Sequence, residues 1–127
     1  MNLLLDSHIS PAVAHALIRR CRGLRVLHLR DWHSRRLLNA PDPDLLAEAA
    51  REGWTLVTYD LRTIVPLLRL WAETDQHHAG VILVDDATIP SHDVGALAAA
   101  LADLWQAHGQ ADWTDRAQYL RRRSPER

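Results

Sequence analysis

The sequence predicts an α/β fold with three layers, α/β/α, in which a mostly parallel central sheet is covered by helices on both faces. Two observations support this class. Short apolar runs alternate with helical patterns along most of the 127 residues, which favours right-handed crossovers between parallel strands. Four of these runs also end in an acid, at Asp6, Asp31, Asp60 and Asp85. In a parallel sheet such acids lie beyond the carboxyl ends of the strands, where these folds bind ligands.

The first part of the chain is expected to form a strand, a helix and a second strand. Residues 2–6 are apolar up to the acid that ends them. Ser10, followed by a proline, provides an N-cap and a first-turn proline for a helix over 11–22. Gly23 can end that helix in a left-handed conformation, and apolar residues over 24–29 then predict the second strand.

The middle of the chain repeats this order. Asp42, again followed by a proline, is expected to cap a helix over 43–52, which a glycine closes. Residues 54–58 are rich in β-formers and give the strongest strand pattern of the chain. Apolar residues at helical spacing predict a helix over 61–74, with Pro66 confined to its first turn.

The last part of the chain is expected to add a buried strand over 80–85 and a long helix over 92–108 that Ser91 caps. We therefore assign residues 1–109 to one α/β domain. Residues 110–127 form a basic C-terminal segment, packed on this domain or trailing from it, as an edge strand or short helix with a frayed end.

Composition excludes several functions. The formal charge of −1 gives no overall attraction to nucleic acid, and all 15 basic residues are arginine. Without lysine, a P-loop, a Schiff-base enzyme and a phospho-receiver domain are disfavoured. The apolar start stops at Asp6 without a basic leader and no later apolar run could span a bilayer, so we expect a cytoplasmic protein without membrane contact.

The strand-end acids are the candidate metal ligands. Neighbouring carboxylates repel unless a cation neutralises them, and their oxygens suit Mg²⁺ or Mn²⁺, which can activate water for attack on a phosphodiester. Asp6 and Asp60 are the first candidates. Asp42 has two interpretations, helix capping and metal binding, and Asp44 or Glu48 could supplement the site from the same helix. The alternative is that acids end strands only because loops are polar.

A basic loop follows the second predicted strand and is a candidate surface for RNA or a protein partner. It holds Trp32, Arg35 and Arg36. The other tryptophans have the spacing of core residues, whereas Trp32 is expected in the loop, where an aromatic ring could stack on a base.

The chain resembles the PIN-like proteins of unknown function that are related to VapC-type toxin ribonucleases. The resemblance rests on the motifs around Leu4-Leu5-Asp6-Ser7-His8, Asp42-Pro43-Asp44-Leu45-Leu46, Ala49 to Gly53 and Leu56-Val57-Thr58-Tyr59-Asp60. It implies a PIN-like fold with a Mg²⁺ or Mn²⁺ site. Asp6, Asp42 and Asp60 match the motif acids as metal ligands and catalytic residues, with Asp44 as a further candidate ligand. The implied activity is that of an endoribonuclease in a toxin–antitoxin pair.

Two departures from the family pattern support a second hypothesis. Ser7 stands where an acid is common, and Arg62 stands where a second acid or asparagine usually follows. In that hypothesis the protein is catalytically inactive and binds RNA or an antitoxin through its arginines. Candidate partners are RNA, an antitoxin protein and a second copy of this chain.

Overall fold

The central sheet has five parallel strands, of which the sequence predicts the first four; the fifth lies in the C-terminal segment, where the sequence left an edge strand and a short helix open. The computed structural model describes residues 1–123, except for the side chain of Ser34, so the end of the predicted basic segment lies outside the described residues. The strand order is β2-β1-β3-β4-β5, and all four pairings are parallel. The strands are β1 (Asn2–Leu5), β2 (Arg25–His28), β3 (Thr55–Thr58), β4 (Val81–Leu83) and β5 (Ala117–Tyr119).

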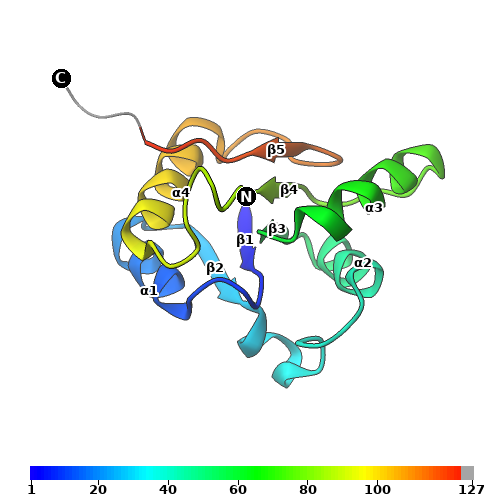
Figure 1. Ribbon diagram of the computed structural model, residues 1–127, viewed down its shortest axis with the longest axis horizontal. Coiled ribbons are helices and arrows are strands. Elements are labelled where there is room, and N and C mark those ends of the chain that lie inside the picture. Colours follow the sequence, from blue (N-terminus) through cyan, green and yellow to red (C-terminus); the bar gives the residue numbers. More distant parts are fainter. Residues whose placement is uncertain (124–127) are drawn as a thin grey trace.

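Helices cover both faces of this sheet, which confirms the three-layer α/β/α class (Figure 1). They are α1 (Pro11–Arg20), the 3-10 helix η1 (Leu29–Arg35), α2 (Asp42–Glu52), α3 (Leu61–Glu73) and α4 (Val94–His108). Helices α1 and α4 pack together on one face, and α2 and α3 pack together on the other.

The two faces of the sheet belong to two separate cores because side chains alternate along each strand. Leu3 and Leu5 of β1 point toward α1 and α4, whereas Leu4 between them points toward α2 and α3. All three side chains are fully buried. A strand that is covered on both sides therefore reads as a continuous apolar run, which is the pattern seen in the sequence.

The start of α4 differs from the prediction. Ser91 is not its cap, because Asp93 takes that position and its side chain accepts a hydrogen bond from the backbone N–H of Ala96 at 3.0 Å. The backbone N–H of Ser91 instead donates to the Asp86 carboxylate at 2.8 Å, in a turn that precedes the helix. Both residue types cap well, and the preceding turn decides which one is placed at the helix end.

Pro66 also lies elsewhere than expected, in the interior of α3 rather than in its first turn. A proline at this position removes the hydrogen bond to the carbonyl of Arg62. Both residues are exposed, so the loss falls on the solvent side of the helix. The buried face of α3, with Ile64, Leu67 and Trp71, remains intact.

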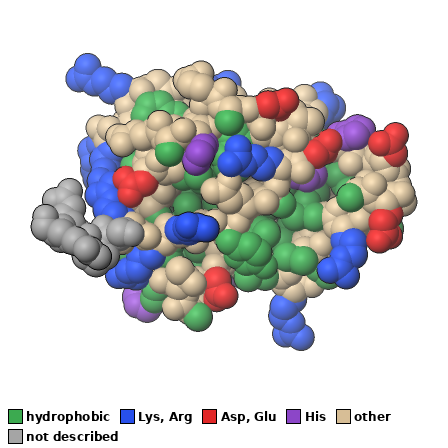
Figure 2. All heavy atoms as spheres, turned by 90° about the horizontal axis from the view of Figure 1, so that it is seen from above, with side chains coloured by type: hydrophobic (Ala, Val, Ile, Leu, Met, Phe, Trp, Pro, Cys, Tyr) green, Lys and Arg blue, Asp and Glu red, His purple; other side chains and the backbone are tan. Residues whose placement is uncertain are grey.

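Strand β5 lies at the edge of the sheet and shapes one surface of the molecule. A groove of about 520 Å³ runs between α3 and β5, and its apolar lining includes Val65, Leu68, Ala117 and Tyr119. Figure 2 shows hydrophobic side chains gathered on this face.

No helix in the described part of the chain is long and apolar enough to cross a bilayer.

The strand order places a crevice at the centre of the sheet. The chain moves outward from β1 to β2 and then returns to form β3 on the other side of β1. Where the order reverses in this way, the connections leave in opposite directions and open a crevice at the carboxyl ends of the two strands. Asp6 follows β1 and Asp60 follows β3, so the two acids border this crevice.

Candidate functional site

Asp6 and Asp60 are linked by the hydroxyl of Thr58, the last residue of β3. This hydroxyl donates to Asp6 Oδ2 at 2.7 Å and accepts from the backbone N–H of Asp60 at 3.0 Å. Asp6 is buried, and its other oxygen accepts from the backbone N–H of Ser7 at 2.7 Å. The carboxylate of Asp6 is therefore held in one orientation by the ends of two neighbouring strands.

Asp42 reaches the same place from α2. The prediction that it caps this helix is wrong, because Pro41 occupies the capping position and no side chain makes a capping bond. Asp42 is the first residue of the helix, and its Oδ2 is buried without a hydrogen-bond partner among the described residues. The carboxylate of Asp42 makes no capping bond and interacts with Asp60 and Asp6 instead.

The electrostatics of Asp42 show that the acids are close. Burial raises the pKa of Asp42, and the negative charges of Asp60 and Asp6 and a hydrogen bond with Asp60 raise it further. His8 acts in the opposite direction. Carboxyl groups from three separate parts of the chain thus lie close enough to influence one another.

This arrangement fits a hard divalent cation. The donors are carboxylate oxygens, and they repel each other when ionised. One of them is buried, and none of the described residues forms a hydrogen bond with it. Mg²⁺ and Mn²⁺ prefer oxygen ligands of this kind and remove the repulsion. The chemistry of the donor set therefore agrees with the metal expected from the sequence.

The other acids of the prediction lie outside this group. Strand β2 ends at His28, so Asp31 is not at a strand end but on the exposed side of η1. Asp85 is also exposed, and it accepts a hydrogen bond from the backbone N–H of Ala87 at 2.9 Å in the turn after β4. Asp44 is exposed in the first turn of α2.

The basic loop is only partly as expected. Arg35 and Arg36 are exposed at the end of η1, and Arg62 is exposed in the first turn of α3, close in sequence to Asp60. Trp32, however, is only 3% exposed and belongs to the core beneath α2 and α3. The expectation that its ring is available for stacking on a base is wrong, because η1 folds back onto α2 and buries it.

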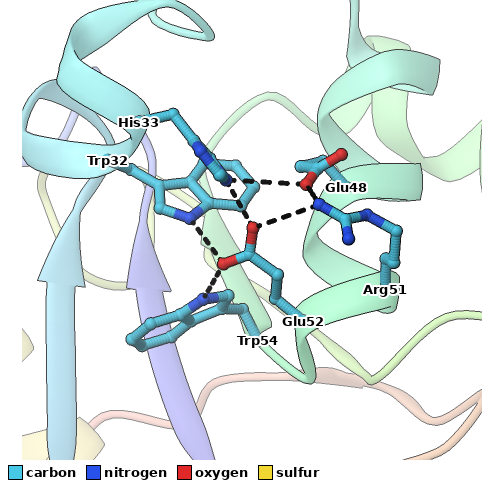
Figure 3. Close-up of polar contacts among 6 residues, drawn as sticks. All are labelled: Trp32, His33, Glu48, Arg51, Glu52 and Trp54. Atoms are coloured by element: carbon cyan, nitrogen blue, oxygen red, sulfur yellow. Dashed lines mark hydrogen bonds and ion pairs between the residues drawn. The ribbon is translucent and has the colours of Figure 1, made fainter.

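A second group of charged side chains, which the sequence did not predict as a unit, lies between η1 and α2 (Figure 3). One side-chain atom each of His33, Glu48 and Glu52 lies within 4.8 Å of the other two. Figure 3 also shows Arg51, which pairs with Glu48 and lies 3.6 Å from Glu52 Oε2. The spacing of Glu48 and Glu52 places both on one face of a helix, but nothing in the sequence brings His33 to that face.

Two buried tryptophans orient Glu52 in this group. Its Oε1 accepts hydrogen bonds from the indole N–H of Trp32 at 3.2 Å and of Trp54 at 3.3 Å, while its Oε2 is hydrogen-bonded to His33. Burial alone would raise the pKa of Glu52, but the hydrogen bonds, including one with Glu48, lower it to about 2. Glu52 is therefore held as an anion.

Comparison with known proteins gave one match. A family model described as a PIN-like domain matches residues 1–78, which contain the elements from β1 to α3. These residues include Asp6, Asp42 and Asp60, which we call the strand-end site. No curated protein and no solved structure matched the chain.

Proposed function

Because the chain belongs to the PIN-like domain family, within a nuclease-type superfamily, we propose that it is a divalent-metal-dependent endoribonuclease. Asp6, Asp42 and Asp60 form its site and hold Mg²⁺ or Mn²⁺. The observation that carries this proposal is the buried Oδ2 of Asp42, which has no hydrogen-bond partner in the described part of the chain and lies near two further carboxylates. A protein rarely retains such a group unless a ligand compensates for it.

Each residue has a defined part in the proposed reaction. Asp6 is oriented by the donors from Ser7 and Thr58, so its carboxylate is held in one position. Asp60 is placed beside it by the bond from its own backbone to Thr58. Asp42 completes the set from α2. A divalent ion bound there would supply Lewis-acid activation of a phosphodiester and of the attacking water.

We assign RNA binding to the arginines near this edge of the sheet. Arg62 follows Asp60 within the first turn of α3, and Arg35 and Arg36 are exposed at the C-terminal end of η1. Guanidinium groups bind phosphate oxygens in a bidentate manner, and such contacts position a nucleic acid without reading its sequence. The substrate is therefore an RNA strand held mainly through its backbone.

The cellular role that we propose is that of a toxin whose activity an antitoxin protein restrains. A negative site of this kind would be inhibited by a basic segment of a partner that neutralises it. Growth arrest on expression of the wild-type chain, and its absence for Asp60→Asn, would support this role. Growth arrest by both proteins would contradict it.

The direct test is RNA cleavage by the purified protein. With Mg²⁺ or Mn²⁺ we expect cleavage that EDTA abolishes and that Asp60→Asn lowers by at least about 100-fold, as for removal of a group that acts in the transition state. Asp75→Asn is a matched control, because Asp75 is fully solvated at the end of α3 and far in sequence from the site acids. Equal cleavage by wild type and Asp60→Asn would refute the mechanism.

A second candidate function is supported by Ser7. Its backbone and hydroxyl both contact Asp6 Oδ1, at 2.7 and 3.5 Å, so this position supplies hydrogen-bond donors instead of a further carboxylate. The protein would then bind RNA or an antitoxin without cleaving. Thermal melting separates the two functions, because a ligand at 100 times its Kd stabilises the native state by about 2.7 kcal/mol. No change in Tm between EDTA and millimolar Mn²⁺, together with RNA binding, would favour this candidate.

A further inference from the structure

We propose that His33, Glu48 and Glu52 form a second metal site, for a first-row transition ion such as Zn²⁺, separate from the strand-end acids. This inference does not rest on nuclease activity. It starts from the geometry: one nitrogen and two oxygens from two elements lie within 4.8 Å of one another. Single ligand atoms at this spacing can bind one ion after small side-chain adjustments.

The three residues are well placed to act as ligands. Glu48 and Glu52 are one helical turn apart on α2, and His33 faces them from η1 (Figure 3). About a quarter of each side chain is exposed, at 24% for His33, 26% for Glu48 and 28% for Glu52. An ion can therefore enter from solvent, while the backbone of both elements holds the ligands in place.

A pair of indole donors supports the carboxylate of Glu52 from behind. Trp32 and Trp54 both donate to Oε1, so this oxygen is occupied and Oε2 is directed toward His33. Metal-binding carboxylates are commonly fixed by such outer hydrogen bonds, which set their orientation and keep them ionised. Both tryptophans are buried, so water competes little for their indole N–H donors.

Arg51 takes the place of the cation when no metal is bound. Its guanidinium pairs with Glu48 and lies 3.6 Å from Glu52 Oε2. The side chain of Arg51 is 68% exposed, so it can turn away into solvent at little cost. A divalent ion would replace it between the two carboxylates. Arg51 is thus a competitor of the metal and not one of its ligands.

The ligand types select the metal. Imidazole nitrogen together with carboxylate oxygen suits Zn²⁺ and its neighbours in the first transition row, whereas Mg²⁺ prefers a shell made only of oxygen. With three protein ligands, water would complete the coordination. The two sites of the molecule therefore differ in selectivity: the strand-end acids take a hard ion, and this one takes a transition ion.

Metal at this position would join η1 to α2 and thereby restrain the segment that carries Arg35 and Arg36. Among the described residues, the polar contacts between these elements centre on Glu48 and Glu52. An ion that binds only the folded arrangement would raise Tm in proportion to its concentration above Kd.

The test is calorimetric titration of the full chain with Zn²⁺. We expect saturable binding in wild type that His33→Ala and Glu52→Gln weaken by about 100-fold, since even loss of an outer-shell partner costs 10- to 100-fold. Asp60→Asn should retain the binding. Arg51→Ala should retain it or bind more tightly, because the competing cation is gone. His77→Ala is the matched control, since His77 is an exposed histidine that also pairs with two acids.

Several results would overturn the proposal. One is the absence of saturable Zn²⁺ binding in both wild type and Arg51→Ala, which would make the group an ion-pair network. Another is equal Zn²⁺ affinity in His33→Ala and His77→Ala, or loss of binding in Asp60→Asn alone. Glu48→Gln guards against misfolding of the other variants, because this side chain is near-isosteric and lies on the surface of α2. Unchanged binding in a folded Glu48→Gln would likewise contradict the site.

Discussion

The two acidic groups of this molecule hold carboxylates in opposite electrostatic states. At the strand ends, burial and the charges of Asp60 and Asp6 raise the pKa of Asp42. Between η1 and α2, hydrogen-bond donors outweigh burial and lower the pKa of Glu52 to about 2. In the first group the acids come from three parts of the chain, and Oδ2 of Asp42 has no hydrogen-bond partner among the described residues. In the second group both acids come from α2, and Glu52 is surrounded by hydrogen-bond donors and an arginine.

The difference shows what each group lacks. Glu52 already has partners for both of its oxygens, so the fold alone stabilises its charge. Asp42 has a buried oxygen that no group within residues 1–123 pairs with, so its charge destabilises the fold unless a cation binds there. A cluster of acids therefore indicates a metal site only when the positive charges and hydrogen-bond donors around it are known.

The largest effect is expected from removing Trp32, which serves both the core and Glu52. Trp32→Ala should lower the free energy of unfolding by about 3–5 kcal/mol, as for other buried aromatic residues. Denaturant unfolding measures this loss. Arg36→Ala, on the exposed side of the same segment, is the control and should change stability by no more than about 0.5 kcal/mol. A small effect of Trp32→Ala would show that η1 is not packed as described.

Glu52→Gln removes the charge that the donors stabilise, and should cost about 1–2 kcal/mol near neutral pH. The pH dependence of this contribution to stability follows from the lowered pKa of Glu52. The stabilising contribution is present above the ordinary value of 4.5 and is lost as pH falls toward the folded-state value of about 2. The difference between wild type and variant should therefore be smaller at pH 3 than at pH 7. A difference that grows on acidification would contradict the hydrogen-bond pattern around Glu52.

The smallest expected change in the free energy of unfolding is a stabilisation, unlike the two losses above. Asp42→Asn should stabilise the metal-free protein at pH 7, by about 0.5–2 kcal/mol, because it removes a carboxylate whose ionised form is disfavoured by burial and by its neighbours. The raised pKa means that this gain disappears as pH falls below 3.8, the ordinary value. Chemical unfolding in EDTA at pH 7 and pH 3.5 measures it. Destabilisation at pH 7 would show that Asp42 is satisfied by the fold.

Most of the fold could be predicted because local patterns and topology agree. Residues 55–58 are rich in β-formers and buried on both faces, as a covered parallel strand requires, and Gly53 ends α2 in the left-handed conformation expected of a glycine there. Helix starts were less predictable. Pro41, rather than Asp42, occupies the capping position of α2, and Asp93, rather than Ser91, caps α4. In both cases the preceding turn, and not the residue type, sets the boundary.

How far each candidate site could be predicted depends on whether sheet topology alone brings its residues together. Asp6 and Asp60 follow neighbouring strands, so sheet topology alone brings them to one edge. Glu52 and His33 meet only because η1 folds back onto α2, which depends on the burial of Trp32. A short 3-10 helix has no strong sequence signal, and a tryptophan among charged residues resembles an exposed one. The second group therefore required three-dimensional information.

The most direct test of the central claim is a calorimetric titration with Mn²⁺. It is best performed with the His33→Ala variant, in which the second site does not contribute. The titration compares this variant with the double variant that also carries Asp60→Asn. We expect saturable Mn²⁺ binding with Asp60 present and its loss in Asp60→Asn, while Asp75→Asn binds normally. Equal binding with and without Asp60, or no binding in any of these proteins, would contradict the assignment of the strand-end acids as a metal site.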